Sequence, residues 1–212
     1  MTAMSRTERA DLCDLALQVG EDQPTLSGEW TVKDLVAHLL IRERNLVAAP
    51  GILVPRLEKL TESSQRRLVR STDFTVLVER LRQGPPVYSP LGWGPVDGLA
   101  NTIEFFVHHE DIRRAQPDWT VRTLSRREES TLWARLKVLG RGLVMGSKVG
   151  IVLQRSDTNS RAVLKSAPSS VVVHGLPGEL TLFTYGRKDQ AVVELEGAPE
   201  DVAKLKGTSL GL

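Results

Sequence analysis

The chain has no excess of charge of one sign and no long apolar run. Its 212 residues include 28 lysines and arginines against 26 aspartates and glutamates, a formal net charge of +2, and the two signs are mixed along the sequence. Such a balance gives no basic stripe for a nucleic-acid partner. No stretch approaches the roughly 20 apolar residues of a membrane span, and the N-terminus lacks the apolar core of a signal peptide. We therefore expect a cytoplasmic protein with neither a nucleic-acid nor a membrane partner.

Cysteine is almost absent. Cys13 is the single one, so an internal disulfide is excluded. Its neighbours in the 10–17 segment place it at a position typical of helix packing, which indicates a structural thiol and not a nucleophile. The short arginine-rich run at 65–70 is typical of the solvated face of a helix.

The period of the hydrophobic pattern changes near residue 145, from helical repeats to short β-like runs. We expect helices at 5–19, 31–48, one or two within 55–83, 96–115 and 125–143, the last beginning with a capping box at Ser125 and Glu128. After them we expect strands at 149–154, 162–164, 171–174 and 191–196, with short helices at 175–186 and 199–205. The predicted fold class is α+β, with a four-helix bundle over 1–120 and a small α/β domain over 121–212.

Two potential metal ligands, Glu104 and His108, lie four residues apart in one predicted helix. This spacing places a carboxylate and an imidazole on the same helix face, within reach of one ion. His38 lies upstream in a second predicted helix. Three nitrogen and oxygen ligands would leave positions open for water, a thiol or substrate, which is the pattern of catalytic metal sites.

The neighbours of Glu104 form a polar stripe bordered by apolar residues. On a helical wheel the stripe covers an arc of about 80°, and its members are Asp97, Asn101, Glu104, His108 and Asp111. The pattern predicts that His108 points inward and His109 toward solvent. Glu110 and Arg114 are expected to pair on a partly exposed flank.

A similar arc surrounds His38, and it contains Asp34, His38, Arg42 and Asn45. Apolar residues cover most of the remaining circumference, which indicates a central helix. Thr31 is its predicted N-cap, with Asp34 three residues on and Trp30 packing ahead of it. Spacing alone leaves another interpretation open: each arc could be a solvated face, and His38 an ordinary surface or core histidine.

The 84–95 segment is too rich in proline and glycine for regular structure, and it carries Tyr88 and Trp93. It either lines a pocket or forms a rigid crossover without functional content. His174 ends a predicted strand and is expected to be structural or exposed.

Three segments resemble the mycothiol-dependent maleylpyruvate isomerase family, which combines a DinB-like helical bundle with a small domain related to sterol carrier proteins. They are Trp30-Thr-Val-Lys-Asp34-Leu-Val-Ala-His38, Glu104-Phe-Phe-Val-His108-His-Glu-Asp111, and Gly175-Leu-Pro-Gly-Glu-Leu together with Tyr185-Gly186-Arg187 and Val193–Gly197. The resemblance implies that His38, Glu104 and His108 bind a divalent metal, usually zinc. It further implies that Arg187 contacts substrate or thiol from the second domain.

The activity implied by this resemblance is isomerisation or S-transfer on a small electrophilic substrate, through mycothiol or a similar thiol activated by the metal. Asp34, Arg42, Asn101 and Asp111 are then candidates to orient ligands or to bind polar groups of the thiol cofactor, and Arg42 and Asn101 are taken as the cofactor-binding pair. A homodimer is compatible with the sequence. His109-Glu110 replaces the small and aromatic residues that often follow this histidine in the family, so the resemblance does not extend to the substrate.

Two rival classes remain on sequence grounds. In one, the chain is a non-enzymatic small-molecule or lipid-binding protein whose polar arcs are structural, and it purifies free of metal. In the other, the chain is a structural or regulatory partner protein.

Overall fold

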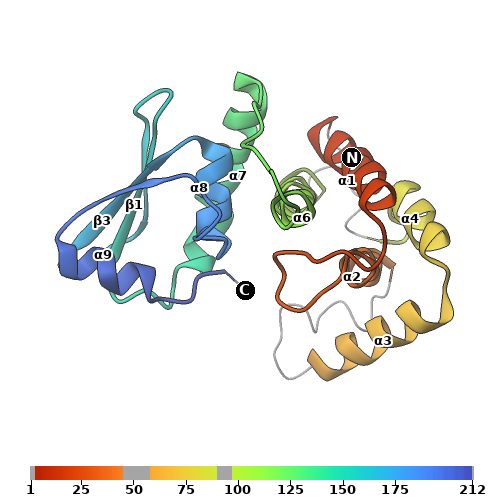
Figure 1. Cartoon of the computed structure of the whole chain (residues 1–212). Helices are drawn as coiled ribbons and strands as arrows, with labels where there is room; N and C mark the ends of the chain where they lie inside the picture. The colour runs from red at the N-terminus through yellow and green to blue at the C-terminus, as the bar shows by residue number, and fades with distance from the viewer. Residues whose placement is uncertain (1–2, 45–57, 90–96, 212) are drawn as a thin grey trace. The chain divides into compact units, whose positions relative to one another are not determined.

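In a computed structural model the chain forms two compact units, Met1–Thr120 and Val121–Leu212. The structure describes residues 3–44, 58–89 and 97–211 (Figure 1). The predicted helix end at 45–48 and the loop residues 90–96, Trp93 among them, lie outside the described residues. No helix in these described ranges is long and apolar enough to cross a membrane.

The first unit is the predicted helical bundle. Its elements are α1 (Ala3–Val19), α2 (Val32–Arg44), α3 (Glu58–Ser71), α4 (Phe74–Arg82), the π-helical turn η4 (Asp97–Asn101) and α6 (Thr102–Arg114). Helix α1 packs against α4 and α6, and α2 packs against α3 and α4. The 55–83 segment thus forms two helices, one of the two outcomes that the sequence allowed.

Local sequence explains where α2 and α4 begin. The Thr31 hydroxyl accepts from the Asp34 amide at 3.3 Å, and the Asp34 carboxylate accepts from the Thr31 amide at 3.1 Å, so the predicted capping box is present. Asp73 caps α4 by accepting from the Thr75 amide at 2.9 Å. These reciprocal bonds satisfy amides that the first turn of a helix leaves without partners.

The core of the first unit is apolar and includes the chain's cysteine. Its fully buried members come from α1, α2, α4 and α6 and include Leu12, Cys13, Leu35, Leu39, Leu77, Leu81, Phe105 and Ile112. Burial raises the pKa of the Cys13 thiol to about 12, although the nearby charges of Arg82 and Arg9 oppose this shift. Cys13 is therefore a packing residue, as the sequence predicted.

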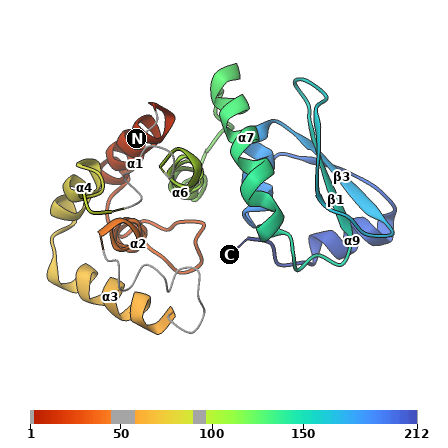
Figure 2. The same ribbon diagram turned by 180° about the vertical axis from the view of Figure 1, so that it is seen from behind.

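The second unit is a four-stranded sheet with helices packed on it. It comprises α7 (Arg126–Leu143), β1 (Gly150–Arg155), β2 (Arg161–Lys165), β3 (Ser170–Gly175), α8 (Pro177–Thr184), β4 (Glu194–Glu196) and α9 (Pro199–Lys206). The strand order is β2-β1-β3-β4, with β1 parallel to β3 and the outer pairs antiparallel. Helices α7 and α8 lie side by side, and the view from behind shows α7 lying along the sheet (Figure 2).

Local sequence signals mark the start of α7, as predicted, and the end of α8. Both bonds of the capping box between Ser125 and Glu128 are present at the start of α7. At the end of α8, Gly186 has φ +88°, and the amides of Gly186 and Arg187 donate to the carbonyls of Phe183 and Leu182. This pattern is a Schellman motif, in which a left-handed residue closes the helix.

One predicted strand is shorter than expected. The sequence predicted a strand over 191–196, whereas β4 covers only Glu194–Glu196. The preceding amides have other partners: Ala191 donates to the Arg187 carbonyl, and Val192 donates to the Glu179 carboxylate at 2.8 Å. Because these donors are already used, they cannot join the ladder with β3.

Candidate metal centre

Helices α2 and α6 bring together the three side chains that the sequence singled out. The imidazole rings of His38 and His108 lie 5.5 Å apart between centroids, at an interplanar angle of 69°. Glu104 Oε2 lies 3.5 Å from His108 Nε2. Both histidines are buried, each about 8% exposed. Two distant segments of the chain therefore place imidazole, carboxylate and imidazole at one location within the first unit.

The second ring nitrogen of His108 is held by Asp111. His108 Nδ1 lies 2.9 Å from Asp111 Oδ2, and the same oxygen accepts from the Ser27 hydroxyl at 2.9 Å. An ionised carboxylate only accepts, so Nδ1 carries the proton and Nε2 faces Glu104. Burial opposes the charged imidazolium, but Asp111 and Glu104 outweigh it and raise the pKa of His108 above its ordinary 6.5.

Arg42 and Asn101 lie beside Glu104. Arg42 Nε is 3.7 Å from Glu104 Oε2, and a second guanidinium nitrogen donates to Asn101 Oδ1. Burial disfavours the charged Glu104 carboxylate, yet Arg42, His108 and His38 together lower its pKa to about 2. The carboxylate is thus ionised at neutral pH, as a metal ligand must be.

Trp30 forms one wall beside His38. Its ring centroid lies 4.8 Å from that of His38, with the planes tilted by 43°. Trp30 also packs against the apolar core of the first unit, as its position ahead of α2 predicted. The indole ring therefore lies against the imidazole and restricts its rotation.

The prediction for His109 was wrong. It is 5% exposed, not solvent-facing, and its Nδ1 lies 2.9 Å from Glu8 Oε2 on α1. Helix α1 covers this face of α6 and supplies a carboxylate that satisfies the buried ring. A helical wheel drawn for α6 alone contains no information about that neighbour.

Glu110 and Arg114 pair as expected, at 2.6 Å, but they are buried and do not form a partly exposed flank. Arg113 also donates to Glu110, at 2.9 Å, and the Arg114 guanidinium lies 4.7 Å from the ring centroid of Trp119. The second guanidinium and the aromatic ring together enclose the pair, which explains why charges at these positions can be buried.

Other sequence candidates have local roles. The carboxylate of Asp34 caps α2 through Thr31. Arg187 belongs to the second unit, where it donates to the Tyr185 carbonyl at 2.6 Å, and its contact with substrate stays a prediction. Tyr88 is 59% exposed.

His174 Nε2 lies 2.8 Å from Glu196 Oε2 on the neighbouring strand, consistent with a structural, partly exposed residue. The side chain of Asp97 lies outside the described residues.

Among the side chains that the structure describes, no group of three or more His, Cys, Asp or Glu residues is arranged to hold a metal ion as it stands. Glu104 is instead shared between Arg42 and His108. The donor types, two imidazoles and one carboxylate, are those that zinc prefers.

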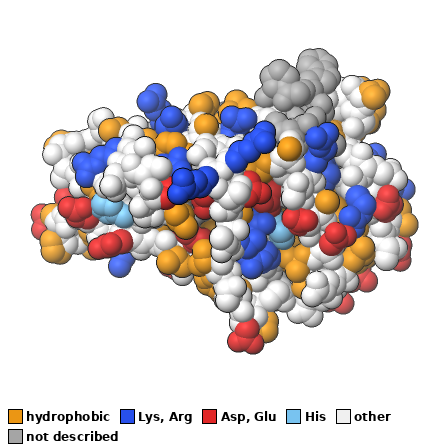
Figure 3. Space-filling model, turned by 90° about the horizontal axis from the view of Figure 1, so that it is seen from above, with side chains coloured by type: hydrophobic (Ala, Val, Ile, Leu, Met, Phe, Trp, Pro, Cys, Tyr) orange, Lys and Arg blue, Asp and Glu red, His pale blue; other side chains and the backbone are white. Residues whose placement is uncertain are grey.

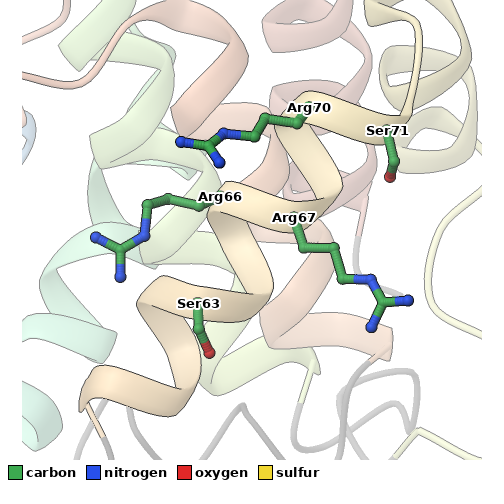
Figure 4. Close-up of a pocket in the computed structure, with 5 residues that line it drawn as sticks. All are labelled: Ser63, Arg66, Arg67, Arg70 and Ser71. Atoms are coloured by element: carbon green, nitrogen blue, oxygen red, sulfur yellow. The ribbon is translucent and has the colours of Figure 1, made fainter.

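A hollow of about 380 Å³ lies on α3, and none of the residues of the histidine–carboxylate cluster lines it (Figure 4). It is lined by Ser63, Arg66, Arg67, Arg70 and Ser71. Arg66 forms an ion pair with Glu62 at 3.7 Å, and both side chains are more than half exposed. This is the solvated helix face that the arginine-rich run predicted. Acidic and basic side chains are also interspersed on the molecular face shown in Figure 3.

Ser27 is the residue of this site that sequence reasoning missed. It lies in an irregular loop, outside any periodic segment, and a serine in a loop is most often a turn residue. Only the fold places its hydroxyl beside Asp111. The only sequence signal near Ser27 was the predicted N-cap at Thr31, which marks the end of this loop.

The fold is that of an α-helical bundle followed by a small α/β domain, and the bundle contains a buried histidine–carboxylate cluster. Two solved structures have a similar fold: the mycothiol-dependent maleylpyruvate isomerase, and its variant with one histidine replaced by alanine. The sequence identities are 14% and 16%, each match covers 92% of this chain and 91% of the other, and both TM-scores are 0.53. The resemblance that the sequence segments suggested is therefore confirmed at the level of fold. Neither a protein-family model nor a curated protein matches the sequence.

Proposed function

We propose that the chain is a thiol-dependent enzyme, an isomerase or S-transferase, whose first unit binds a divalent metal, zinc, through His38, Glu104 and His108. The observation that carries this proposal is the approach of the two imidazoles to 5.5 Å beside the Glu104 carboxylate. The shared fold with a mycothiol-dependent maleylpyruvate isomerase supports the thiol-dependent class.

The donor types of these residues and the hold on one of the rings support a metal site. Metal-binding histidines commonly donate their second ring N–H to a carboxylate, and the contact between His108 Nδ1 and Asp111 has this form. It leaves Nε2 as the ligand atom, on the side where Glu104 lies. Two imidazoles and one carboxylate suit zinc, and they leave at least one coordination position for a thiol or water.

When bound, a divalent metal would lower the pKa of a coordinated thiol, so that the thiol ionises at neutral pH. Addition of the thiolate to an electrophilic double bond would leave a single bond that can rotate, and elimination of the same thiolate would give the isomer, whereas retention of the thiol would give S-transfer. The chain's own residues do the rest. Arg42 and Asn101 stand beside Glu104 and are proposed to bind polar groups of the thiol cofactor. Arg187 is proposed as a contact of substrate or thiol from the second unit.

The reacting thiol must come from outside the chain. Cys13 is fully buried in the apolar core, and its pKa is raised to about 12. A thiol in that state is neither a nucleophile nor a metal ligand at neutral pH. The proposed thiol is therefore mycothiol or a similar low-molecular-weight thiol.

Metal content tests the proposal. Protein purified without a polyhistidine tag should contain about one divalent metal ion per chain by elemental analysis. His38→Ala and Glu104→Ala should lose it, while their circular dichroism stays that of the parent. The matched control is His174→Ala, which removes a histidine of the second unit and should retain full metal content.

Activity provides the second test. Metal-loaded parent protein should isomerise a small electrophilic alkene, or transfer the thiol to it, only when a low-molecular-weight thiol is present. A parent that is free of metal and purifies with a bound lipid would support the non-enzymatic alternative. A parent that binds metal but converts no electrophile with any thiol would contradict the catalytic part alone.

A further inference from the structure

The 25–30 loop contacts both helices that carry the candidate histidines. The Trp30 ring lies 4.8 Å from that of His38 on α2. The Ser27 hydroxyl donates to Asp111 Oδ2 on α6 at 2.9 Å, and the Leu26 amide donates to the Asp111 carbonyl at 3.1 Å. One short loop therefore touches one imidazole directly, and the other through the carboxylate that holds it.

The loop is closed by its own hydrogen bonds. The amide and hydroxyl of Thr25 donate to the Trp30 carbonyl at 3.2 and 2.9 Å. The Trp30 amide donates to the Ser27 carbonyl at 3.3 Å, and the Ser27 amide donates to the Thr25 hydroxyl at 3.2 Å. Gly28 has φ +64° within this closed turn. These bonds fix the distance between Ser27 and Trp30, so that the loop acts as one piece.

We propose that the 25–30 loop positions both histidine rings for the proposed metal centre, with Trp30 acting on His38 and Ser27 acting on His108 through Asp111. This inference rests on the proposed function and adds to it the residues that preorganise the ligands. Neither Ser27 nor Trp30 supplies a donor to the metal, so both are positioning residues.

A histidine ring needs such contacts because it can rotate about its χ2 angle. The χ2 angle of histidine is broad and roughly two-fold, so that a ring held only by its backbone presents either nitrogen to a given point. The carboxylate of Asp111 removes this freedom for His108, and Asp111 is itself fully buried and receives Ser27 on the same oxygen. The indole ring of Trp30 packs against His38 and restricts the plane of its ring.

Zinc affinity provides the first test, measured on the full-length chain by competition with a chromophoric chelator. Ser27→Ala and Trp30→Leu should each bind zinc about tenfold more weakly, in the range measured for residues that orient ligands. Trp30→Phe keeps an aromatic ring and should restore most of the affinity. Glu29→Ala, in the same loop but exposed, is the matched control and should bind like the parent.

A further variant distinguishes the loss of ring positioning from a general loss of stability. Val78→Ala removes volume from the core of the same unit, at a residue that is 1% exposed. It should lower the melting temperature while zinc affinity stays that of the parent. If Val78→Ala weakens zinc binding as much as Ser27→Ala and Trp30→Leu do at equal loss of melting temperature, the positioning role is overturned.

The metal-free protein provides an independent readout. The ring ¹⁵N and ¹H signals of His108 should move in Ser27→Ala and those of His38 in Trp30→Leu, and both should stay in place in Glu29→Ala. Unchanged ring signals in the first two variants would overturn the inference. This measurement needs no metal, so it tests the positioning role even if the parent binds no zinc. Absence of zinc binding in the parent would contradict only the proposed function.

Discussion

The rings of His38 and His108 lie 5.5 Å apart at an angle of 69°, on two helices that the sequence separates widely. A metal shared by the two rings would need both of them in the neutral form. Because Asp111 and Glu104 raise the pKa of His108, metal and proton compete for that ring.

The first prediction concerns Asp111. Asp111→Asn keeps the shape of the side chain but removes the charge that holds the proton on His108 Nδ1. We expect zinc affinity to fall about 10- to 100-fold, as for other residues that orient metal-binding histidines. Chelator competition measures the change. Asp157→Asn, in the second unit, is the control, and equal affinity in Asp111→Asn and the parent would refute the orienting role.

The second prediction concerns pH and the metal-free protein. The folded state raises the pKa of His108 above 6.5, so the stability that its proton contributes is fully present below 6.5 and is lost as pH rises through the folded pKa. Glu104 has the opposite sign. Its pKa falls from 4.5 to about 2, so its contribution is present above 4.5 and is lost as pH falls toward 2.

Urea unfolding between pH 3 and 9 checks these signs: the two contributions should overlap most between 4.5 and 6.5. His108→Gln should flatten the decline above neutrality, and Glu104→Gln the decline on the acid side. Zinc affinity should instead increase with pH until the proton on His108 is lost, because metal and proton compete for the ring. A pH-independent affinity would argue against His108 as a ligand.

The third prediction concerns a buried ion pair outside the site. Arg9 Nη1 donates to Glu43 Oε2 at 2.9 Å and to the Leu81 carbonyl at 2.8 Å, and the two side chains are only 2% and 0% exposed. Glu43→Ala leaves a buried cation without its partner and should cost about 3–5 kcal/mol. The double variant Arg9→Met, Glu43→Leu should recover most of this loss in thermal and urea unfolding. Additive losses would contradict the account.

The fourth prediction compares two glycines of the second unit. At Gly186, with φ +88°, an added Cβ would lie 2.6 Å from the Leu210 carbonyl oxygen. Gly186→Ala should therefore destabilise the protein by more than about 1 kcal/mol. At Gly142, inside α7, a Cβ meets nothing within 4 Å. Gly142→Ala should stabilise the protein by roughly 0.5–1 kcal/mol, and equal effects at both positions would contradict the argument.

Sequence predicted those features that depend on neighbours in the chain. The capping boxes at Thr31 and Ser125 were readable because their partners lie three residues away. The shared face of Glu104 and His108 followed from helical spacing, and the α+β fold class followed from the change of period. In each case the physical cause lies within one element.

The parts that sequence could not supply depend on contacts between elements. His109 was assigned to solvent because its acidic partner, Glu8, lies on another helix. Ser27 gave no signal because its role exists only where its loop meets Asp111. The shortened β4 has the same origin, since Glu179 takes the amide of Val192. Each of these is a hydrogen bond between residues far apart in the chain.

The deep burial of the single thiol has a practical consequence. Cys13 is 0% exposed in the core of the first unit, so an alkylating reagent reaches it only when that unit opens. Its labelling rate therefore reports the opening of the bundle without an introduced probe. Zinc that binds the folded bundle should slow this labelling, and the slowing should increase with the affinity of the bundle for zinc. The labelling rate of Cys13 therefore also measures ligand binding.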